Sequence, residues 1–392
     1  MMPRMKVAAA VAVTVLALAG AARAPSAPAL ATLDTKLPAW LAPGVTLEIA
    51  GSADPGTEVV LAHAQGTAAS VAVGDDGRFT MRARLERVGV HRLTASSVDA
   101  ALELGRLRVR PVRLAAVGDV TFGGRVAAAI AARGPSHPWL GTGGVLRGAD
   151  LATANLEGVV STRGVPVSDK EFHFRGPLSA LPAARRVAGL DVVSLANNHT
   201  LDFGTVAFLD TLRFARRSGI LTVGGGPDLT SARRPVVIRR GGVRIGFLGY
   251  SDVRPEGFTA ARSTAGTAPA ESSSIQADVV ALRRRADVVV VWFHWGDELA
   301  LRPGARQRTF ASAALNAGAQ LVLGAHPHVL QPIVRPARRS LVAWSLGNFV
   351  FAPNSPGTDR TGILHVDLAA DGVRTHRLQR ARIVGVQPRF ER

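Results

Sequence analysis

The sequence predicts an α/β fold preceded by a small all-β domain, and two patterns along the chain lead to that prediction. Short strands with turn-forming separators fill residues 37–110, whereas apolar runs alternate with helical segments after Pro111. The 392 residues are enough for two domains, and a hydrophobic share of 47% can form a sizeable core. We therefore expect domains at 37–110 and 113–392.

The first 31 residues have the layout of an export signal. Arg4 and Lys6 precede an apolar run at 7–20, and small residues follow it. The run is shorter than the ~20 residues that span a bilayer. Two interpretations stay open, a cleaved signal peptide at 1–31 or an uncleaved amino-terminal anchor. Both predict a protein that is secreted or extracytoplasmic.

The composition excludes several classes of chemistry. Cysteine is absent, which removes disulfide scaffolds, cysteine zinc sites, iron–sulfur clusters and thiol nucleophiles. The net charge is +18, but only Lys6, Lys36 and Lys170 are lysines among the 47 basic residues. Such an arginine share, beside so much alanine, glycine and valine, is typical of GC-rich coding. Because aromatic and basic residues are not interleaved, we expect no nucleic-acid partner.

Residues 37–110 predict a β-sandwich. Leu47 and Ile49 alternate with polar positions, and the tripeptides DPG and DDG separate the strands. The segment resembles the small immunoglobulin-like modules of bacterial surface proteins. It holds no cluster of catalytic groups, so we expect a spacer or a module that contacts a polymer.

Residues 113–392 predict layered sheets and outer helices. Runs such as DVVVVWF are apolar throughout, as strands buried on both faces are. A helix is expected over 205–217, ending at Gly219, and a second over 307–317. Residues 235–250 predict a hairpin that turns at 241–242. The apolar stripe of the first helix is Phe208, Leu209, Leu212 and Ala215.

Polar side chains follow five of the predicted strands, at the point where each strand ends. In open α/β sheets, ligands bind at the carboxyl ends of the strands. Two carboxylates, an amide and several imidazoles at one edge are suitable ligands for Mn, Fe or Zn. The residues are Asp119, Asn155, Glu157, Asn197, Asn198, His199, His294, His326 and His328.

Each of these residues also has a structural interpretation. Asp119 and Asn198 can satisfy turns, Glu157 can pair with an arginine, and His294 beside two tryptophans can be a core histidine. The GAHPH segment is a more specific indication of a metal site. Pro327 favours an extended His326, and residues two apart in an extended segment point to the same side. We therefore expect the rings of His326 and His328 to face one centre.

The chemistry explains these residue types. A carboxylate can bridge two cations ~3.5–4 Å apart, and two such ions polarise a phosphoryl group and activate a water molecule. A neutral histidine beside the site can protonate the leaving oxygen. His199 adjoins the proposed ligand Asn198 and is the natural candidate for this proton transfer.

The strings GDVTFGG, ANLEG, DVVSLANNHTLDFG, FHWGDE, GAHPHVLQP and SLGNFVF occur in this order between about Arg113 and Phe351. Together they resemble the CapA family of capsule and poly-γ-glutamate synthesis proteins, which is related to calcineurin-like metallophosphoesterases. The resemblance implies a four-layer fold with two mixed sheets between helices.

The resemblance also implies a role for each residue. Asp119, Glu157, Asn198, His294, His326 and His328 match the metal ligands, and His199 matches a proton donor. Two positions depart from the phosphoesterase pattern. Thr121 stands where that pattern has a histidine, and glutamate replaces aspartate at 157. One metal would then have a weaker ligand set, so we expect one or two ions.

Four further residues are secondary candidates. Glu298 could orient His294 or could be a helix-start acid. Arg175 could hold an anionic substrate group or form a solvated salt bridge. Asn348 is expected near the site as a turn amide, and Asp202 is expected to cap the helix at 205–217.

The resemblance implies an exported, metal-dependent hydrolase or transferase that acts on an anionic envelope polymer such as poly-γ-glutamate. A membrane-bound synthesis complex is the implied partner. The alternative is a protein on the same fold that binds or guides the polymer without turnover, which the threonine at 121 favours.

Overall fold

The computed structural model describes residues 32–97, 100–168 and 170–391. The predicted export signal at 1–31 lies outside the described residues. Two compact units are present. The smaller holds 32–36, 48–81 and 93–104 apart from 98–99, and the larger holds the remaining described residues. The domain limits 37–110 and 113–392 stay predictions. Over the described ranges, every helix is too short or too polar to cross a membrane.

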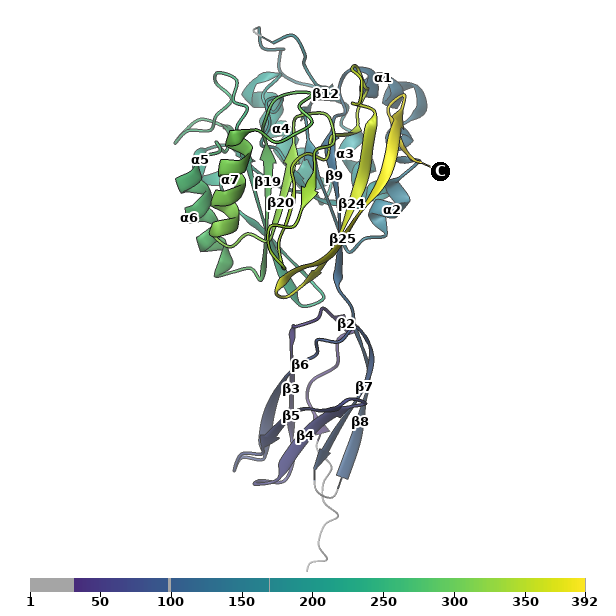
Figure 1. Ribbon diagram of the computed structural model, residues 1–392, viewed down its shortest axis with the longest axis vertical. Coiled ribbons are helices and arrows are strands. Elements are labelled where there is room, and N and C mark those ends of the chain that lie inside the picture. The colour runs from purple at the N-terminus through teal and green to yellow at the C-terminus, as the bar shows by residue number, and fades with distance from the viewer. Residues whose placement is uncertain (1–31, 98–99, 169, 392) are drawn as a thin grey trace, which may run out of the picture. The chain divides into compact units, whose positions relative to one another are not determined.

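The amino-terminal strands form two sheets (Figure 1). One has the order β1-β3-β6 and the other β2-β8-β7-β4-β5. Side chains are alternately buried and exposed along β6, and Leu47 and Ile49 lie on the buried side of β3, as predicted. The strands are β1 Thr32–Leu33, β2 Trp40–Leu41, β3 Thr46–Ser52, β4 Glu58–His63, β5 Gly66–Ala72, β6 Arg78–Arg84, β7 Gly89–Ser97 and β8 Ala100–Val109.

The first sheet of the larger unit is mixed and has the order β14-β13-β10-β9-β24-β25-β26, with β23 also paired to β9. Strands β9, β10, β13 and β14 are parallel, and β24 to β26 continue the sheet in antiparallel pairs. The strands are β9 Val112–Val120, β10 Leu151–Leu156, β13 Leu190–Ser194, β14 Leu221–Val223, β23 Asn348–Val350, β24 Arg360–Ala369, β25 Gly372–Val384 and β26 Gln387–Phe390.

The second sheet of the larger unit has the order β16-β17-β19-β20-β22-β21. Its four central strands are parallel and the two outer pairs are antiparallel. The strands are β16 Val236–Arg240, β17 Val243–Ser251, β19 Val288–His294, β20 Leu321–Ala325, β21 Ile333–Val334 and β22 Leu341–Ala343. Two short pairs complete the unit, β11 Val159–Val160 with β12 Arg175–Gly176, and β15 Gly225–Gly226 with β18 Gly266–Thr267.

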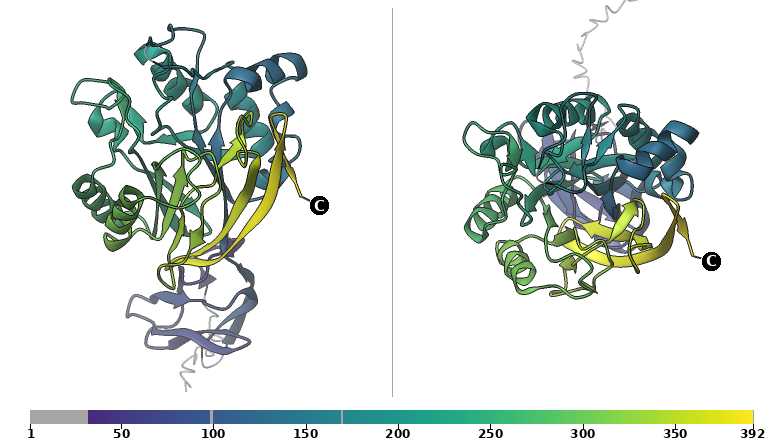
Figure 2. Two further views of the ribbon diagram at one scale, coloured as in Figure 1. Left: turned by 45° about the horizontal axis from the view of Figure 1, so that its top comes forward. Right: turned by 90° about the horizontal axis from the view of Figure 1, so that it is seen from above.

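The helices lie on both sides of these two sheets (Figures 1 and 2). The α-helices are α1 Gly124–Arg133, α2 Gly143–Arg147, α3 Ala180–Ala183, α4 Gly204–Arg217, α5 Leu229–Ala232, α6 Ser272–Arg283 and α7 Ala305–Asn316. A 3-10 helix at His137–Trp139 and a π-helix at Ala184–Ala188 are also present.

Three apolar clusters separate four layers in the larger unit. Val117 of β9 packs with Phe208 of α4 on the outer side of the first sheet. Leu114 of β9 belongs with Val290 of β19 to the cluster between the two sheets. Val291 lies in a third cluster with residues of α6 and α7. The strands are buried on both faces, and the α/β prediction is confirmed.

The predicted local elements are largely confirmed. The two helices are α4 and α7, and the predicted hairpin is β16–β17, whose turn glycines have φ of 52° and 83°. The apolar stripe of α4 was partly wrong. Leu209 is 39% exposed, whereas Asp210 and Thr211 are buried because they hydrogen-bond to the segment at 160–163.

Candidate metal centre

The carboxyl ends of the parallel strands of both sheets lie close together at the candidate metal centre. In the first sheet, Asp119 of β9 pairs with Asn155 of β10 and Asn348 of β23. In the second sheet, His294 ends β19 and pairs with Ala325, the residue before His326. Segments far apart in the sequence therefore meet because strand register brings their ends together.

The first group of ligand atoms belongs to Asp119, Glu157 and His294. Their ligand atoms lie within 4.8 Å of one another, and each residue is at most 1% exposed. Both carboxylate oxygens of Glu157 are buried and have no hydrogen-bond partner in the described chain. A buried polar group without a partner costs about 1–3 kcal/mol, and more if it is charged. This carboxyl group therefore fits a bound cation.

Burial and the neighbouring Asp119 carboxylate raise the pKa of Glu157 well above its usual value. Burial opposes ionisation of Asp119 as well, but the nearby His328, together with hydrogen bonds from Asn155 and the His326 backbone N–H, outweighs burial and lowers the pKa of Asp119. The Asn155 amide donates to Asp119 Oδ1 at 2.8 Å, and the His326 N–H donates to Oδ2 at 3.2 Å.

His294 is held by two amides. Its Nε2 lies 2.8 Å from Asn198 Oδ1, and its Nδ1 lies 3.3 Å from the side-chain nitrogen of Asn155. Burial, together with the nearby His326 and His328, lowers the pKa of His294 well below its usual value. A neutral imidazole beside an amide oxygen is a suitable ligand pair for a divalent ion.

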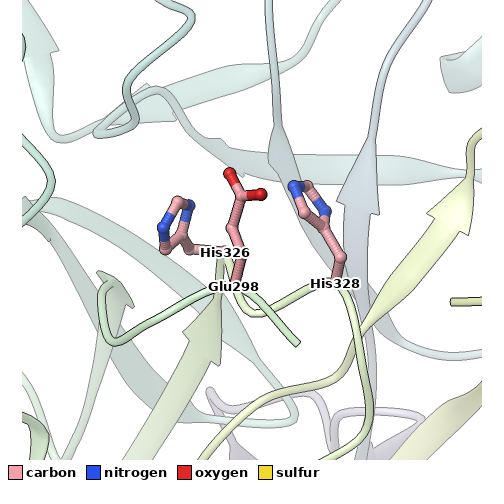
Figure 3. Close-up of side chains that lie close together, drawn as sticks. All are labelled: Glu298, His326 and His328. Atoms are coloured by element: carbon pink, nitrogen blue, oxygen red, sulfur yellow. The ribbon is translucent and has the colours of Figure 1, made fainter. Parts of the chain in front are cut away.

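The second group of ligand atoms belongs to Glu298, His326 and His328, again within 4.8 Å of one another (Figure 3). The Glu298 carboxylate lies between the two rings. The Leu299 N–H donates to the carbonyl of Pro327, which joins the two loops. Glu298 was a candidate to orient His294 or to be a helix-start acid, and in the structure its carboxylate lies beside His326 and His328.

The expected extended backbone at His326 is wrong. Its φ is 98° and that of His328 is 59°, and Leu299 at 61° is the other non-glycine residue with positive φ in the described chain. Each such conformation costs of order 1–3 kcal/mol and is kept by its surroundings. Here the His326 N–H is held by Asp119 Oδ2. The rings nevertheless lie together, with centroids 6.0 Å apart.

The two rings have opposite electrostatic surroundings. Burial and the neighbouring His328 lower the pKa of His326 to about 3, and its Nδ1 is buried without a hydrogen-bond partner. Burial also disfavours a charged His328, but Glu157 and Asp119 outweigh it and raise its pKa to about 10. His328 Nδ1–H donates to Asn348 Oδ1 at 2.8 Å, so Asn348 lies beside the site as expected.

His199 lies at the edge of the first group. Its Nε2 is 3.7 Å from Glu157 Oε1, and its Nδ1 is 2.7 Å from Asp202 Oδ2. Burial lowers the pKa of His199. Asp202 was expected to cap α4, which is wrong. The amino-terminal cap of α4 is Phe203, and Asp202 is fully buried against His199 and Lys170.

Sequence reasoning missed Lys170 and the amide network. Asn155 accepts a hydrogen bond from the Asn197 amide at 3.2 Å, and Asn197 Oδ1 accepts from the backbone N–H of His199. The two amides therefore connect Asp119 to His199.

Two predicted positions take other partners. The Arg175 guanidinium donates to the carbonyls of Arg163 and Gly164 and lies over the Phe203 ring at 4.0 Å. These contacts stabilise the loop, and its role towards a substrate stays a prediction. Thr121 Oγ1 accepts from the Gly123 N–H at 3.1 Å, so Thr121 forms a local turn.

The unpartnered atoms of Glu157 and His326 fit a divalent ion, and the remaining donors are those such ions accept. The fold and this site define a mixed α/β protein with a candidate metal centre where the carboxyl ends of two sheets meet.

The chain belongs to the family described as bacterial capsule synthesis protein PGA_cap, whose model matches residues 113–353. It is 31% identical over 258 residues to the PGA biosynthesis protein CapA of Bacillus subtilis (strain 168), a match that covers 65% of this chain and 67% of that protein. It is 29% identical over 268 residues to the capsule biosynthesis protein CapA of Bacillus anthracis, covering 65% of this chain and 64% of that protein.

Solved structures give more distant similarities. A 5′-nucleotidase precursor from Thermus thermophilus aligns with a TM-score of 0.38 and 16% identity, covering 69% of this chain and 54% of that one. The NAD nucleotidase of Haemophilus influenzae aligns with a TM-score of 0.40 and 13% identity, covering 69% and 50%.

Proposed function

We propose that this protein is an exported, metal-dependent hydrolase of capsule or poly-γ-glutamate biosynthesis, which acts on an anionic envelope polymer or its precursor. Membership of the PGA_cap family supports the process. The Glu157 carboxyl group supports the metal dependence, because both of its oxygens are buried without a partner beside Asp119 and His294. This single observation carries the proposal.

Asp119, Glu157, Asn198 and His294 would hold one divalent ion, and Glu298, His326 and His328 would hold a second. A bound ion of this kind supplies Lewis acidity and lowers the pKa of a water molecule. Mn, Fe and Zn all suit the mixed oxygen and nitrogen donors.

Residues of the chain orient the proposed metal ligands and can transfer a proton. Asn155 fixes Asp119 and His294 through one amide group, so these two side chains cannot rotate independently. His199 turns its Nε2 toward Glu157 while its Nδ1 donates to Asp202. With the ring proton on Nδ1, the Nε2 atom offers a lone pair that can take a proton from the attacking water molecule and then pass it to a leaving oxygen.

The polymer and the cellular location belong to the same proposal. The net charge of +18 would attract a polyanion over several ångströms. We assign the strands β1 to β8 to an immunoglobulin-like module that serves as a spacer or a polymer contact. A signal peptide or anchor at 1–31 would place the protein in the envelope, within reach of a membrane-bound synthesis complex.

A second candidate function is binding of the polymer without turnover. One observation favours it. Thr121 takes the position that the phosphoesterase pattern gives to a histidine, and it forms a turn instead of offering a ligand atom to either group.

The experiment compares metal content and turnover in the same samples. The purified protein is stripped with a chelator, reloaded with Mn, Fe or Zn, and analysed by plasma mass spectrometry. Turnover is then measured with a chromogenic phosphoester and with poly-γ-glutamate of defined length. The proposal expects bound metal and metal-dependent turnover of at least one substrate, and Glu157→Gln should lose the ion of the first group and the turnover.

Glu256→Gln is the matched control, because it makes the same chemical change at an exposed residue. It should keep wild-type metal content and rate. Metal retained without turnover of either substrate would favour the binding function. Equal metal content in Glu157→Gln and in wild type would contradict the proposed site.

A further inference from the structure

Lys170 is unusual in this chain. Of the 47 basic residues only three are lysines, so arginine is the default cation. Lys36 is exposed, whereas the Lys170 side chain is 14% exposed and lies beside His199. Lysine at a buried position in an arginine-rich protein indicates that this site needs the smaller ammonium group.

The ammonium group lies among three polar atoms. Lys170 Nζ donates to Asp202 Oδ1 at 2.5 Å and to the backbone carbonyl of Asn198 at 2.5 Å, and it lies 3.2 Å from His199 Nδ1. The ammonium donates to the two oxygens from one nitrogen atom, whereas a guanidinium spreads its donors over a wide planar fork. An arginine would therefore not reproduce these contacts in the same space.

The position of the proton on His199 follows from these contacts. Nδ1 lies 2.7 Å from Asp202 Oδ2, and a bare nitrogen at that distance would set one lone pair against another. Nδ1 therefore carries the proton and donates it to the carboxylate, which leaves Nε2 directed at Glu157.

Asp202 depends on Lys170 to remain in this arrangement. Its side chain is fully buried and accepts from His199, Lys170 and the Phe174 backbone N–H. The Phe174 ring also lies against the His199 ring, with centroids 4.4 Å apart. Removing one partner of a buried charge pair leaves the other uncompensated, so loss of Lys170 would displace the carboxylate.

We propose that Lys170 is a positioning residue for His199. By holding the Asp202 carboxylate and the Asn198 carbonyl on one ammonium group, it keeps the proton of His199 on Nδ1 and the Nε2 atom facing the metal centre. Its effect on turnover rests on the proposed hydrolase function. Its effect on the His199 ring does not.

The kinetic test uses Lys170→Arg, which keeps the charge, with Lys36→Arg as the matched control at an exposed lysine. Residues that orient a site residue through a second hydrogen bond typically change activity about 10–100-fold. We expect kcat of Lys170→Arg to fall by that factor while KM and metal content stay within about twofold of wild type. Lys36→Arg should match wild type. An unchanged kcat in Lys170→Arg would overturn the proposal.

A second measurement is independent of turnover. Long-range ¹⁵N–¹H spectra of the full-length, histidine-labelled protein report which ring nitrogen carries a proton. Wild type and Lys36→Arg should show an Nδ1–H signal for His199, and Lys170→Arg should lose it. Lys170→Gln provides the same comparison without added bulk, should the arginine prevent folding. If the protein turns over no substrate, the proposed function fails. The spectra then test the role of Lys170 by themselves. An unchanged Nδ1–H signal in the variants would overturn the role of Lys170.

Discussion

The two groups of ligand atoms differ in their access to solvent. Asp119, Glu157 and His294 are all buried, whereas the second group includes Glu298, which is exposed. Water can solvate the exposed carboxylate, but no water is available to solvate a buried one. An ion should therefore stabilise the first group more strongly and exchange from it more slowly. On the proposed function, the centre would therefore combine a tightly held ion with a labile one.

The largest expected effect is at Glu157. Glu157→Gln should abolish tight metal binding, because the substitution removes the one buried carboxylate in the described chain whose two oxygens both lack a hydrogen-bond partner. An ion at 100 times its dissociation constant should raise the melting temperature of wild type by roughly 5–10 °C. Thermal unfolding with and without metal measures this rise. It should be absent in Glu157→Gln and present in Glu256→Gln, and a full rise in Glu157→Gln would remove the distinction between the two groups.

His199 comes next. His199→Asn should lower kcat by about 10²–10⁴-fold, the usual contribution of a general acid or base. Metal content should not change, because no ligand atom of either group is removed. Stopped-flow or steady-state rates, measured beside metal analysis, separate these effects. A loss of metal in this variant would assign His199 to the ligands instead.

A substitution at Glu298 tests whether the two groups of ligand atoms bind separate ions. Glu298→Gln should weaken one ion by about 10–100-fold and leave the other unchanged, because only the second group contains this carboxylate. Isothermal titration should then resolve two binding steps in wild type and a selective weakening of one in the variant. Equal weakening of both steps would show that the groups act as a single site.

The smallest effect is expected at Asp210, which belongs to neither group of ligand atoms. This buried carboxylate is held by Arg163 and Ser161, and these hydrogen bonds lower its pKa to about 2. Because its pKa is lowered in the folded state, the stabilisation is fully present above the ordinary aspartate pKa of ~3.9 and is lost as pH falls toward 2. Asp210→Asn should therefore lower the melting temperature by a few degrees at pH 7, and by less as the pH falls below ~4. An equal loss at both pH values would contradict this origin.

Much of the first group could be predicted from the sequence. Its three residues lie at or directly after the ends of buried strands: Asp119, Glu157 and His294. The carboxyl ends of parallel strands lie at the same edge of a sheet. Asn348 could be placed for the same reason, because β23 pairs with β9.

The sequence predicted that His326 and His328 face one centre, but it did not predict their backbone conformation, the place of Glu298 beside them or the surroundings of His199. A residue before proline favours an extended backbone, but the hydrogen bond from the His326 N–H to Asp119 holds His326 at positive φ. Glu298, Lys170 and Asp202 lie on loops, where no periodicity reports the path of the chain. Their positions depend on tertiary contacts, such as that between Leu299 and Pro327.

The central claim is that Glu157 and His294 bind a divalent ion together. Anomalous diffraction from crystals loaded with Mn tests it most directly. We expect a peak about 2.0–2.3 Å from a carboxylate oxygen of Glu157 and from a ring nitrogen of His294. Mn-loaded crystals with no peak between these two side chains would contradict the account.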